Sequence, residues 1–402
     1  MRSLSLILLT LALACDHDGP EPEDHDADEP AVARAAEPAR PGAPPEHDGG
    51  VQTMPAAEAA FAEVLKLIED GYIDAKLDRD ALYTGAAEGM LARLYQVGDH
   101  PVNALLNPRE LEELMHDTTG SIVGVGVEIA HTAGVIVINR VIPRGPAALG
   151  GLEPGDRILG VDGQRVHDLS LPEVVDKIRG AAGSKVDLFV QRDTEEWNAS
   201  LTRATVTMQN VGPAELEDGI AVLPIRAFAE NTPAELDAAV ADLRSRGMRA
   251  LVLDVRECPG GMLDAAVAVT ARFLARGQTI AAMQARDGAA RPFVAESDGP
   301  HRDLAVAVLV GPHTASGAEV LADALQHHGR AIVVGGDTLG KDSVEHIHKL
   351  ANGWGLKLTQ GRLLGADGRA REGKGIHPRL PVPGDDAAAL SVARAWLRER
   401  LR

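Results

Sequence analysis

Apolar residues in the first third of the chain recur at a helical spacing in two places. The first group lies three and four positions apart, which predicts an amphipathic helix, and consists of Phe61, Val64, Leu65 and Ile68. A second pattern of this kind runs from Asp80 to about Tyr95 and predicts another helix. We interpret the two as a small helical unit over 53–118, which packs either on the rest of the chain or on a second copy of it.

The hydrophobic pattern changes at Gly120, where short runs rich in β-branched residues replace the helical spacing. Turn-forming sequences such as 153–156 separate these runs. One helix interrupts them, because Ser170 and Glu173 have the spacing of a capping box in front of apolar residues. The pattern predicts a β-rich domain over 119–205.

Beyond residue 205, apolar runs alternate with helical patterns. This alternation predicts an α/β core with a mostly parallel sheet over 206–384, followed by a C-terminal helix over 385–402. Thr232 and Glu235 predict a capping box at the start of the first helix of this core. Its strands are expected at 220–228, 250–254, 304–310 and 331–334.

Two polar sequences follow predicted strands of this core. DVRECPGG starts at the end of the strand at 250–254, and TASGAE follows the strand at 304–310. Functional residues of parallel α/β sheets gather at the carboxyl ends of the strands. We therefore expect the two sequences to lie close together.

Composition separates an acidic segment from the rest of the chain. The 402 residues carry a formal net charge of −19, and 16–50 alone holds 11 Asp and Glu against 2 Arg, with seven prolines and no aromatic residue. Such a segment cannot bury enough apolar surface to fold, so 16–52 is predicted to be a disordered, self-repelling tether. Because the chain has no basic stripe, nucleic acid is not an expected partner.

The first 15 residues have the pattern of a secretion signal. Arg2 precedes an apolar run over 4–13, which is too short to span a membrane as a helix. Ending at Cys15, the segment resembles a bacterial lipoprotein signal, with Ala12 where leucine is usual. The resemblance implies lipidation of Cys15, attachment to the membrane by the lipid alone, and a location on the periplasmic or extracytoplasmic side of the bacterial cell envelope. Cleavage by an ordinary signal peptidase is the alternative. With Cys15 lipidated, Cys258 leaves no intramolecular disulfide to expect.

The β-rich domain resembles a PDZ domain in the order of its motifs. A Gly-x-Gly-x loop at 124–127 and a G-x-x-x-G-D-x-I element at 151–158 precede the helix. The resemblance implies that the loop holds the carboxylate of a protein C-terminus while the peptide adds as a strand beside 127–129. A vestigial groove is the alternative. The expected peptide-binding residues are Gly124, Val125, Gly126 and Val127, with Val175 and Ile178 on the helix forming a pocket for the last side chain.

Ser316 and Lys341 are the candidate catalytic residues. Ser316 begins a predicted helix, whose free N–H groups and dipole favour a developing oxyanion, and Lys341 follows 25 residues later in a Gly-rich turn. A serine hydroxyl becomes a strong nucleophile when a base removes its proton, and a lysine can be that base only when burial makes it neutral. From the pattern alone, a serine at a helix start is more often a cap.

From about 61 to 382 the chain resembles the carboxyl-terminal processing peptidases, or tail-specific proteases, which are serine endopeptidases with a Ser/Lys dyad and an inserted PDZ domain. The matching sequences are DVRECPGG, TASGAE, ALQ, GRAIVVGGDTLGK, LKLTQGR and GKGIHP. The resemblance implies that Ser316 forms an acyl-enzyme with Lys341 as general base. It further implies that backbone N–H groups of Gly261 and Gly317 bind the oxyanion, that substrates have apolar C-termini, and that no cofactor is needed.

Four residues depart from the family's pattern. Glu345 stands where glutamine is usual and Asp342 where glycine is usual, so two carboxylates near Lys341 would hold its proton on. A buried, protonated Glu345 would instead orient Lys341 as the amide does, which makes it a third candidate catalytic residue. Leu339 replaces a phenylalanine, and His327 stands where Asp is common.

Two functions therefore stay open: an envelope endopeptidase that cuts proteins near their C-termini, and an adaptor that binds such tails without cutting them. Cys258, at the end of a predicted strand, is not expected to be a nucleophile. The histidines of the acidic segment are interpreted as part of a solvated polyanion, and the others lack the spacing of metal ligands, so no metal site is expected.

Overall fold

The structure is a computed structural model that describes residues 55–402 except 75, 95, 98, 99, 133, 134, 168 and 372. The signal, Cys15 and the tether over 16–52 lie outside the described residues. The chain divides into two compact units at the boundary between Ala87 and Glu88. In the smaller unit, α1 (Pro55–Gly71) and the first residues of α2 (Arg79–Leu91) form the two helices that the apolar spacing predicts.

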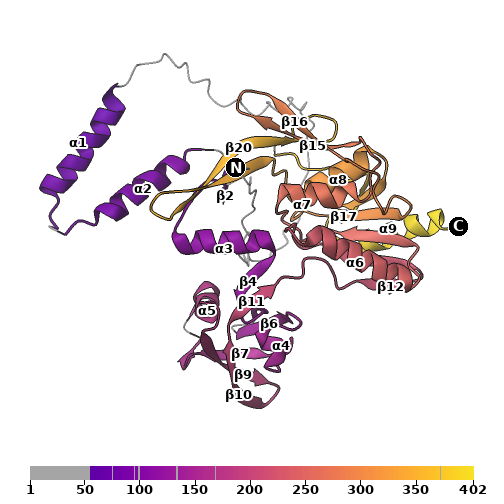
Figure 1. Ribbon diagram of the computed structural model, residues 1–402, viewed down its shortest axis with the longest axis horizontal. Coiled ribbons are helices and arrows are strands. Elements are labelled where there is room, and N and C mark those ends of the chain that lie inside the picture. Colours follow the sequence, from indigo (N-terminus) through magenta and orange to yellow (C-terminus); the bar gives the residue numbers. More distant parts are fainter. Residues whose placement is uncertain are drawn as a thin grey trace, which may run out of the picture. The chain divides into compact units, whose positions relative to one another are not determined.

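The larger unit contains a β-rich domain whose edge strand is open (Figure 1). Its sheet has the strand order β10-β9-β7-β6-β5, with β8 on β7, while β4 pairs with β11. Because β5 ends the sheet, its outer side can pair with a further strand. The elements are β4 (Ser121–Gly124), β5 (Val127–Thr132), β6 (Val135–Val141), α4 (Pro146–Leu149), β7 (Arg157–Val161), β8 (Gln164–Arg165), α5 (Leu171–Ile178), β9 (Lys185–Arg192), β10 (Glu195–Thr202) and β11 (Ala204–Thr207).

Alternate residues of these strands form the core of the β-rich domain. Ile136 and Ile138 of β6 are buried while their neighbours are less so, which is the period of two expected of a strand with one buried face. Val174 of α5 packs into the same core. α5 starts with the predicted capping box, in which Ser170 N–H donates to Glu173 Oε2 at 2.8 Å.

The α/β core is built on a sheet with the order β12-β13-β14-β17-β18-β21. All its neighbours are parallel except β12, which confirms the predicted sheet. α6, α7 and α8 cover one face of the sheet and α9 covers the other (Figure 1). The bounds are β12 (Glu215–Glu217), β13 (Ile220–Pro224), α6 (Thr232–Ser245), β14 (Ala250–Asp254), α7 (Leu263–Ala271), β17 (Ala305–Val310), α8 (Gly317–His327), β18 (Ala331–Gly335), β21 (Leu380–Pro381) and α9 (Asp386–Arg400).

A second, antiparallel sheet packs beside α8 and has the order β16-β15-β20-β19, with β3 on β20. This sheet was not predicted from the sequence. Its strands are β15 (Thr279–Ala285), β16 (Ala290–Val294), β19 (Ser343–Lys349), β20 (Gly355–Leu364) and β3 (Ala104–Leu106). The segment before the β-rich domain also contains α3 (Pro108–Thr119) and a separate pair of short strands, β1 (Gln96–Val97) and β2 (His100–Pro101).

The capping box predicted at α6 is wrong. The N-cap residue is Asn231, one position earlier than Thr232. Glu235 does not accept the backbone N–H of the N-cap residue: its Oε1 accepts the side-chain amide of Asn231 at 2.8 Å, and its Oε2 accepts the backbone N–H groups of Asn210 and Val211 at 2.8 and 3.0 Å. Tertiary hydrogen bonds to the segment after the β-rich domain have therefore replaced the capping-box hydrogen bond from the backbone N–H of the N-cap residue.

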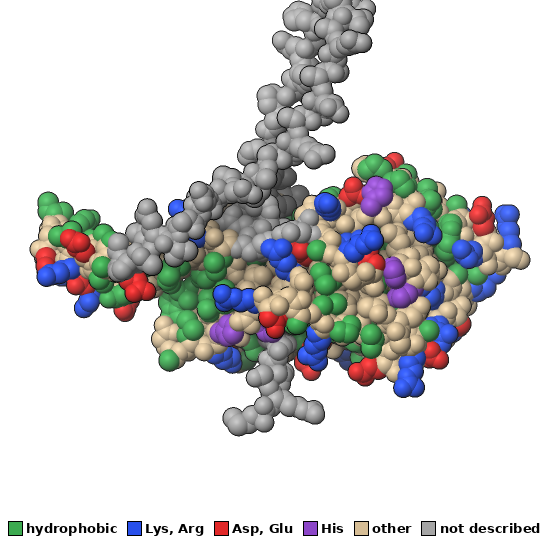
Figure 2. All heavy atoms as spheres, turned by 90° about the horizontal axis from the view of Figure 1, so that it is seen from above, with side chains coloured by type: hydrophobic (Ala, Val, Ile, Leu, Met, Phe, Trp, Pro, Cys, Tyr) green, Lys and Arg blue, Asp and Glu red, His purple; other side chains and the backbone are tan. Residues whose placement is uncertain are grey.

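Charges on the surface are mixed. On the face that Figure 2 shows, the described Lys and Arg side chains are scattered among Asp and Glu rather than gathered in a stripe. Within 55–402, apart from the eight residues left out, no helix combines the length and the apolar character that crossing a membrane requires.

Candidate active site

Ser316 lies in the turn between β17 and α8 as the N-cap residue of that helix. Its φ of 51° and ψ of −115° are unusual for a residue with a side chain. Strain of this kind costs about 1–3 kcal/mol and is typically retained at functional sites. The residue is 6% exposed. The backbone thus holds a buried hydroxyl at the positive end of a helix.

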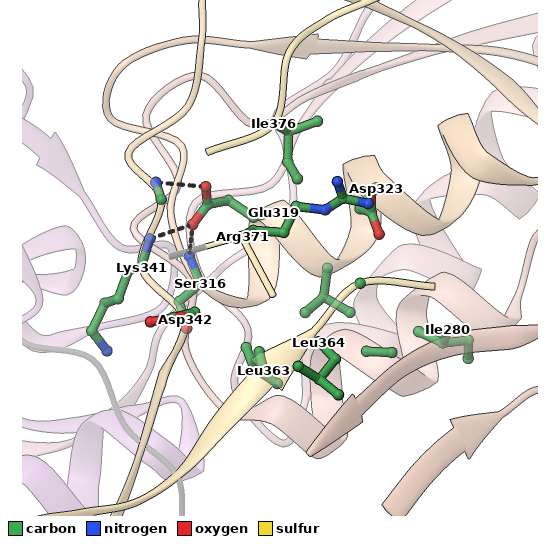
Figure 3. A pocket seen from close by; sticks show the side chains of 14 residues that line it. Ile280, Ser316, Glu319, Asp323, Lys341, Asp342, Leu363, Leu364, Arg371 and Ile376 are labelled. Atoms are coloured by element: carbon green, nitrogen blue, oxygen red, sulfur yellow. Dashed lines mark hydrogen bonds and ion pairs between the residues drawn. The ribbon is translucent and has the colours of Figure 1, made fainter. Parts of the chain in front are cut away.

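Glu319 ties the turn of Ser316 to the loop of Lys341 (Figure 3). Its Oε2 accepts the backbone N–H groups of Ser316 at 2.7 Å and Lys341 at 3.0 Å. Its Oε1 accepts the Thr338 hydroxyl at 2.5 Å and the Gly340 N–H at 2.7 Å. Burial raises the pKa of this carboxyl, and the hydrogen bonds act in the opposite direction. One buried side chain therefore fixes the segments of Ser316 and Lys341 relative to each other.

This role of Glu319 was not predicted from the sequence. The Ser-x-x-Glu spacing at 316–319 is a capping-box signal that could have identified its contact with Ser316. Glu319 also contacts the loop at 338–341, about twenty positions further along the chain. No short sequence pattern predicts contacts over that separation.

Lys341 and Glu345 form a buried ion pair. Lys341 Nζ donates to Glu345 Oε2 at 2.9 Å, and the two side chains are 8% and 1% exposed. Glu345 Oε1 is buried and has no hydrogen-bond partner in the described part of the chain. Among the described residues, Ser316 Oγ and Lys341 Nζ share no hydrogen bond, and Figure 3 draws no contact between them. In this arrangement Lys341 is bound to Glu345 and not to Ser316.

The other three residues that depart from the family's sequence pattern lie in different surroundings. Asp342 is 3% exposed and lines the same pocket as Ser316 and Lys341. Leu339, by contrast, is 49% exposed, and His327 is an exposed residue of the last turn of α8. Of these residues, only Asp342 adds a buried carboxylate to the site.

The Gly-Gly turn after β14 lies against the turn of Ser316, as the strand ends predict. A Cβ at Gly260 would lie 2.8 Å from Ala315 O, 2.9 Å from Gly317 N and 2.9 Å from Ser316 Cβ. Side chains are never found this close, and Gly260 also has a φ of 104°. Only glycine fits at this contact, so the two turns approach each other through it.

Gly261 and Gly317, the predicted oxyanion donors, lie next to this contact. A Cβ at Gly261 would lie 2.3 Å from Phe228 O, and one at Gly317 would lie 3.3 Å from Phe228 Cδ2. Gly317 is the first residue of α8, where backbone N–H groups have no partner within the helix. The structure thus brings both glycines to the neighbourhood of Ser316, although Gly260 makes the closer approach.

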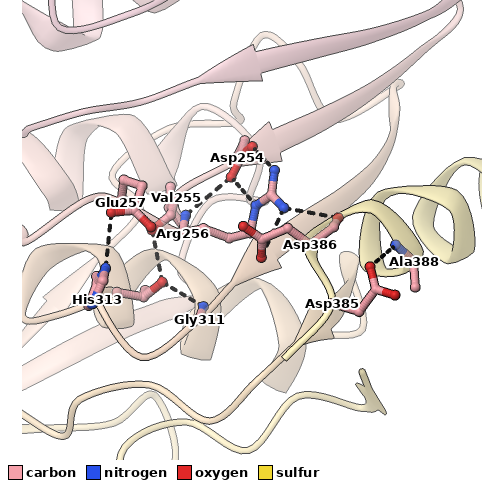
Figure 4. A network of polar contacts seen from close by, with 10 residues as sticks. Asp254, Val255, Arg256, Glu257, Gly311, His313, Asp385, Asp386 and Ala388 are labelled. Atoms are coloured by element: carbon pink, nitrogen blue, oxygen red, sulfur yellow. Dashed lines mark hydrogen bonds and ion pairs between the residues drawn. The ribbon is translucent and has the colours of Figure 1, made fainter. Parts of the chain in front are cut away.

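Polar contacts brace the two turns (Figure 4). Arg256 binds Asp254 with two hydrogen bonds, Nε to Oδ1 at 2.9 Å and Nη2 to Oδ2 at 2.6 Å. The Thr314 hydroxyl donates to Val255 O at 2.8 Å and accepts the Gly311 N–H at 2.9 Å. These contacts hold the segments before Gly260 and before Ser316 in one arrangement.

The predicted peptide-binding loop of the β-rich domain adjoins its open edge. Gly124 ends β4 and Val127 begins the edge strand β5, with Val125 and Gly126 between them. Val125 is buried in the domain core. On α5, which is the predicted pocket helix, Ile178 is buried in that core as well, whereas Val175 is half-buried.

Cys258 is fully buried behind the Gly-Gly turn. Burial raises the pKa of its thiol to about 12, so a thiolate is disfavoured at neutral pH. Within the residues that the structure describes, no three His, Cys, Asp or Glu side chains cluster in a way that could hold a metal ion.

Comparisons with known proteins place this site in a family. The profile of peptidase family S41 matches residues 219–382, and the profile of a PDZ domain matches residues 137–192. The carboxy-terminal processing protease CtpA of Bacillus subtilis is 30% identical over 316 residues, which are 78% of this chain and 67% of that protein. The chain belongs to peptidase family S41. Its β-rich domain is a PDZ domain, and the resemblance read from the sequence is confirmed.

A second relative supports the same family assignment. A probable CtpA-like serine protease of Staphylococcus haemolyticus is 30% identical over 318 residues, which are 79% of this chain and 63% of that protein. The chain thus spans about two thirds of the length of the curated relatives that it matches.

The fold agrees with a solved S41 structure. A putative S41 protease from Bacteroides fragilis has a TM-score of 0.51 and 18% identity, over 78% of this chain and 89% of that one. At this identity the match supports the S41 fold, an α/β core with a PDZ domain.

Proposed function

We propose that this S41 protein is a serine endopeptidase that binds the C-terminal tails of proteins through its PDZ domain and cleaves near them. The observation that carries the proposal is that Ser316 and Lys341 line one pocket and are held together by Glu319. Its substrates are polypeptides with apolar C-termini, and the chemistry needs no cofactor.

The acylation step uses Lys341 as a neutral amine. Lys341 takes the proton of Ser316 Oγ as that oxygen attacks the carbonyl carbon of the scissile bond. Backbone N–H groups of Gly261 and Gly317 stabilise the resulting oxyanion. When the intermediate collapses, the C–N bond breaks, Lys341 gives its proton to the leaving amine, and an ester on Ser316 remains. A water that Lys341 deprotonates then attacks the ester, releasing the new carboxyl end and restoring the serine.

The ion pair between Lys341 and Glu345 corresponds to a resting arrangement. A protonated lysine has no lone pair with which to accept the proton of Ser316. Transfer of the shared proton to Glu345 would leave a neutral amine beside a neutral carboxyl, and loss of water from a buried site favours the neutral pair over two charges. A bound substrate that excludes water from the pocket would favour this transfer, so that Glu345 orients the active base.

The test replaces each member of the dyad. Ser316→Ala and Lys341→Ala are each expected to lower cleavage of a peptide with an apolar tail by at least about a thousandfold, since each removes an essential group. Cleavage is measured by mass spectrometry. The Ser316→Ala variant should still bind the tail peptide with a free carboxylate, and an amidated peptide should bind more weakly. Full cleavage in both variants would overturn the proposal.

A second candidate is an adaptor that binds protein tails without cutting them. The buried contact between Lys341 Nζ and Glu345 Oε2 favours it, because a permanently protonated lysine leaves Ser316 without a base. Labelling of Ser316 by a fluorophosphonate probe separates the candidates. Labelling at neutral pH supports the endopeptidase, whereas tail binding without labelling up to about pH 9 supports the adaptor.

We place the activity in the bacterial cell envelope, on the extracytoplasmic side, with a lipid on Cys15 as the membrane attachment. The support is the short apolar run that ends at this cysteine and the acidic segment over 16–52 that follows it. A homodimer formed through the helical unit remains an alternative to a monomer.

A further inference from the structure

The pocket that adjoins Ser316 is also lined by an ion pair, in which the Asp323 carboxylate is buried and the Arg371 side chain is partly exposed. It follows one face of α8, on which Ser316, Glu319 and Asp323 recur at the helical spacing. Asp323 lies seven positions after Ser316, which corresponds to about 10 Å along a helix axis. Figure 3 shows Ser316 at one end of the pocket and the pair of Asp323 and Arg371 at the other.

This ion pair is held from several sides. Arg371 Nη2 lies 2.6 Å from Asp323 Oδ1 and 3.3 Å from Asp367 Oδ1. Asp323 Oδ2 accepts the Ala366 N–H at 2.8 Å. A Cβ at Gly365 would lie 2.6 Å from Asp323 Oδ2 and 2.7 Å from Arg371 Nη2, so this glycine lets the chain pack directly on the pair. A pair with these contacts cannot move aside without leaving a buried charge unpaired.

Between Ser316 and the ion pair the pocket is narrow and mostly apolar. About 30 Å³ is open to the centre of a water-sized sphere, which is room for about two waters or a few methyl groups. Its apolar lining comes from α8, the second sheet and the loops beside it, and consists of Ile280, Ala281, Val320, Leu363, Leu364 and Ile376. The space suits a short apolar side chain.

We propose that Asp323 and Arg371 determine the substrate specificity of the enzyme. The pair closes the pocket that receives the side chain preceding the scissile bond, and therefore admits residues of the size of alanine or valine. A longer side chain must displace Arg371 from Asp323 and leave the buried Asp323 carboxylate without its partner, which opposes its binding. This inference rests on the proposed function, because it concerns the bond that Ser316 attacks.

The experiment compares two peptides with the same apolar tail that differ only in having Ala or Leu before the cleaved bond. The full chain is expected to favour the Ala peptide by at least about tenfold in kcat/KM. The variant Asp323→Ala/Arg371→Ala removes both charges together, and should lower this preference by about tenfold because the pocket becomes longer. The ratio compares two substrates of one preparation, so a partly unfolded sample does not change it.

Two further variants complete the experiment. Arg371→Ala alone changes a side chain that is 31% exposed, and should lower the preference in the same direction if the double variant does not fold. As a matched control, Arg244→Ala/Asp303→Ala removes a surface ion pair with side chains 38% and 63% exposed, and should keep the wild-type ratio.

The outcomes separate the two proposals. A wild-type enzyme that cleaves both peptides equally, or pocket variants that keep the wild-type ratio, would overturn the role of the Asp323–Arg371 pair and leave the proposed function intact. If the wild-type chain cleaves neither peptide, the proposed function falls and this inference falls with it.

Discussion

At the scale of single residues, the charge of Glu345 decides whether Lys341 can act as a base. The carboxylate lies 2.9 Å from Lys341 Nζ, and both side chains are buried. An ionised carboxylate at this distance attracts a positive charge on the amine. A glutamine has nearly the same shape and keeps an oxygen acceptor but carries no charge. The exchange therefore isolates the effect of the charge from that of the packing.

We predict that Glu345→Gln activates Ser316 at neutral pH. Without the carboxylate, burial favours the neutral amine, so the rate of fluorophosphonate labelling at pH 7 should rise by about tenfold. The rate is measured from pH 6 to pH 10, and the rise with pH should begin at a lower pH than in the wild type. Asp303→Asn, which neutralises an exposed carboxylate, serves as the control. Slower labelling at every pH would mean that Glu345 is required as a charged group.

At the scale of elements, the sequence predicted the parts that depend on local pattern. The parallel strands, α8 with Ser316 at its start, and the meeting of the two strand-end turns all follow from apolar runs, glycines and the rule for strand ends. The second sheet did not follow from them. Its strands β15 and β20 are neighbours although about eighty residues separate them, and their pairing depends on tertiary packing.

The same limit explains the residues whose roles were missed. Lys357 lies within a sequence that matched the family, LKLTQGR, yet nothing in that string shows that β20 brings it close to the dyad. Glu235 has the spacing of a capping box but binds Asn210 and Val211 instead. The spacing of residues in the sequence predicts only hydrogen bonds between near neighbours in the chain. A side chain can form a hydrogen bond with a distant segment in place of the local one.

Strand β20 adds a second buried lysine to the site. Lys357 is 2% exposed. Burial lowers the pKa of Lys357, the charge of Lys341 lowers it further, and Glu345 acts in the opposite direction. Because electrostatic coupling between two groups is mutual, a charge on Lys357 also opposes a charge on Lys341. The two buried lysines therefore repel each other when both carry a charge.

We predict that Lys357→Met moves the pH profile of cleavage upward. Methionine keeps an unbranched apolar stem and removes the charge, so Lys341 should hold its proton to a higher pH. The rise of kcat/KM with pH is expected to shift by about one unit in the alkaline direction. Lys349→Met, at an exposed position of β19, is the matched control and should not shift the profile. A loss of activity without a shift would indicate a purely structural role for Lys357.

At the scale of the whole molecule, the substrates that the site meets depend on where the chain is held. Between the predicted lipid on Cys15 and the start of α1 at Pro55 lie 39 residues, from 16 to 54. The disordered tether that the composition predicts would have a root-mean-square reach of about 35 Å, which its like charges would extend. An enzyme on such a tether would work within a short distance of the membrane surface, where tethering raises its effective concentration toward membrane-bound substrates.

We predict that Cys15→Ala releases the full-length protein from the membrane fraction into the soluble extracytoplasmic fraction, because a lipid is the proposed attachment. Immunoblots of the two fractions measure the change. Cleavage of a soluble peptide by the released protein should stay as in the wild type, since the proposed chemistry does not use Cys15, whereas cleavage of a membrane-anchored substrate should fall at least tenfold as the effective concentration is lost. A wild-type chain found in the soluble fraction would instead point to ordinary signal cleavage. A Cys15→Ala chain that stays with the membrane would show that the N-terminal apolar run, and not a lipid, holds the protein there.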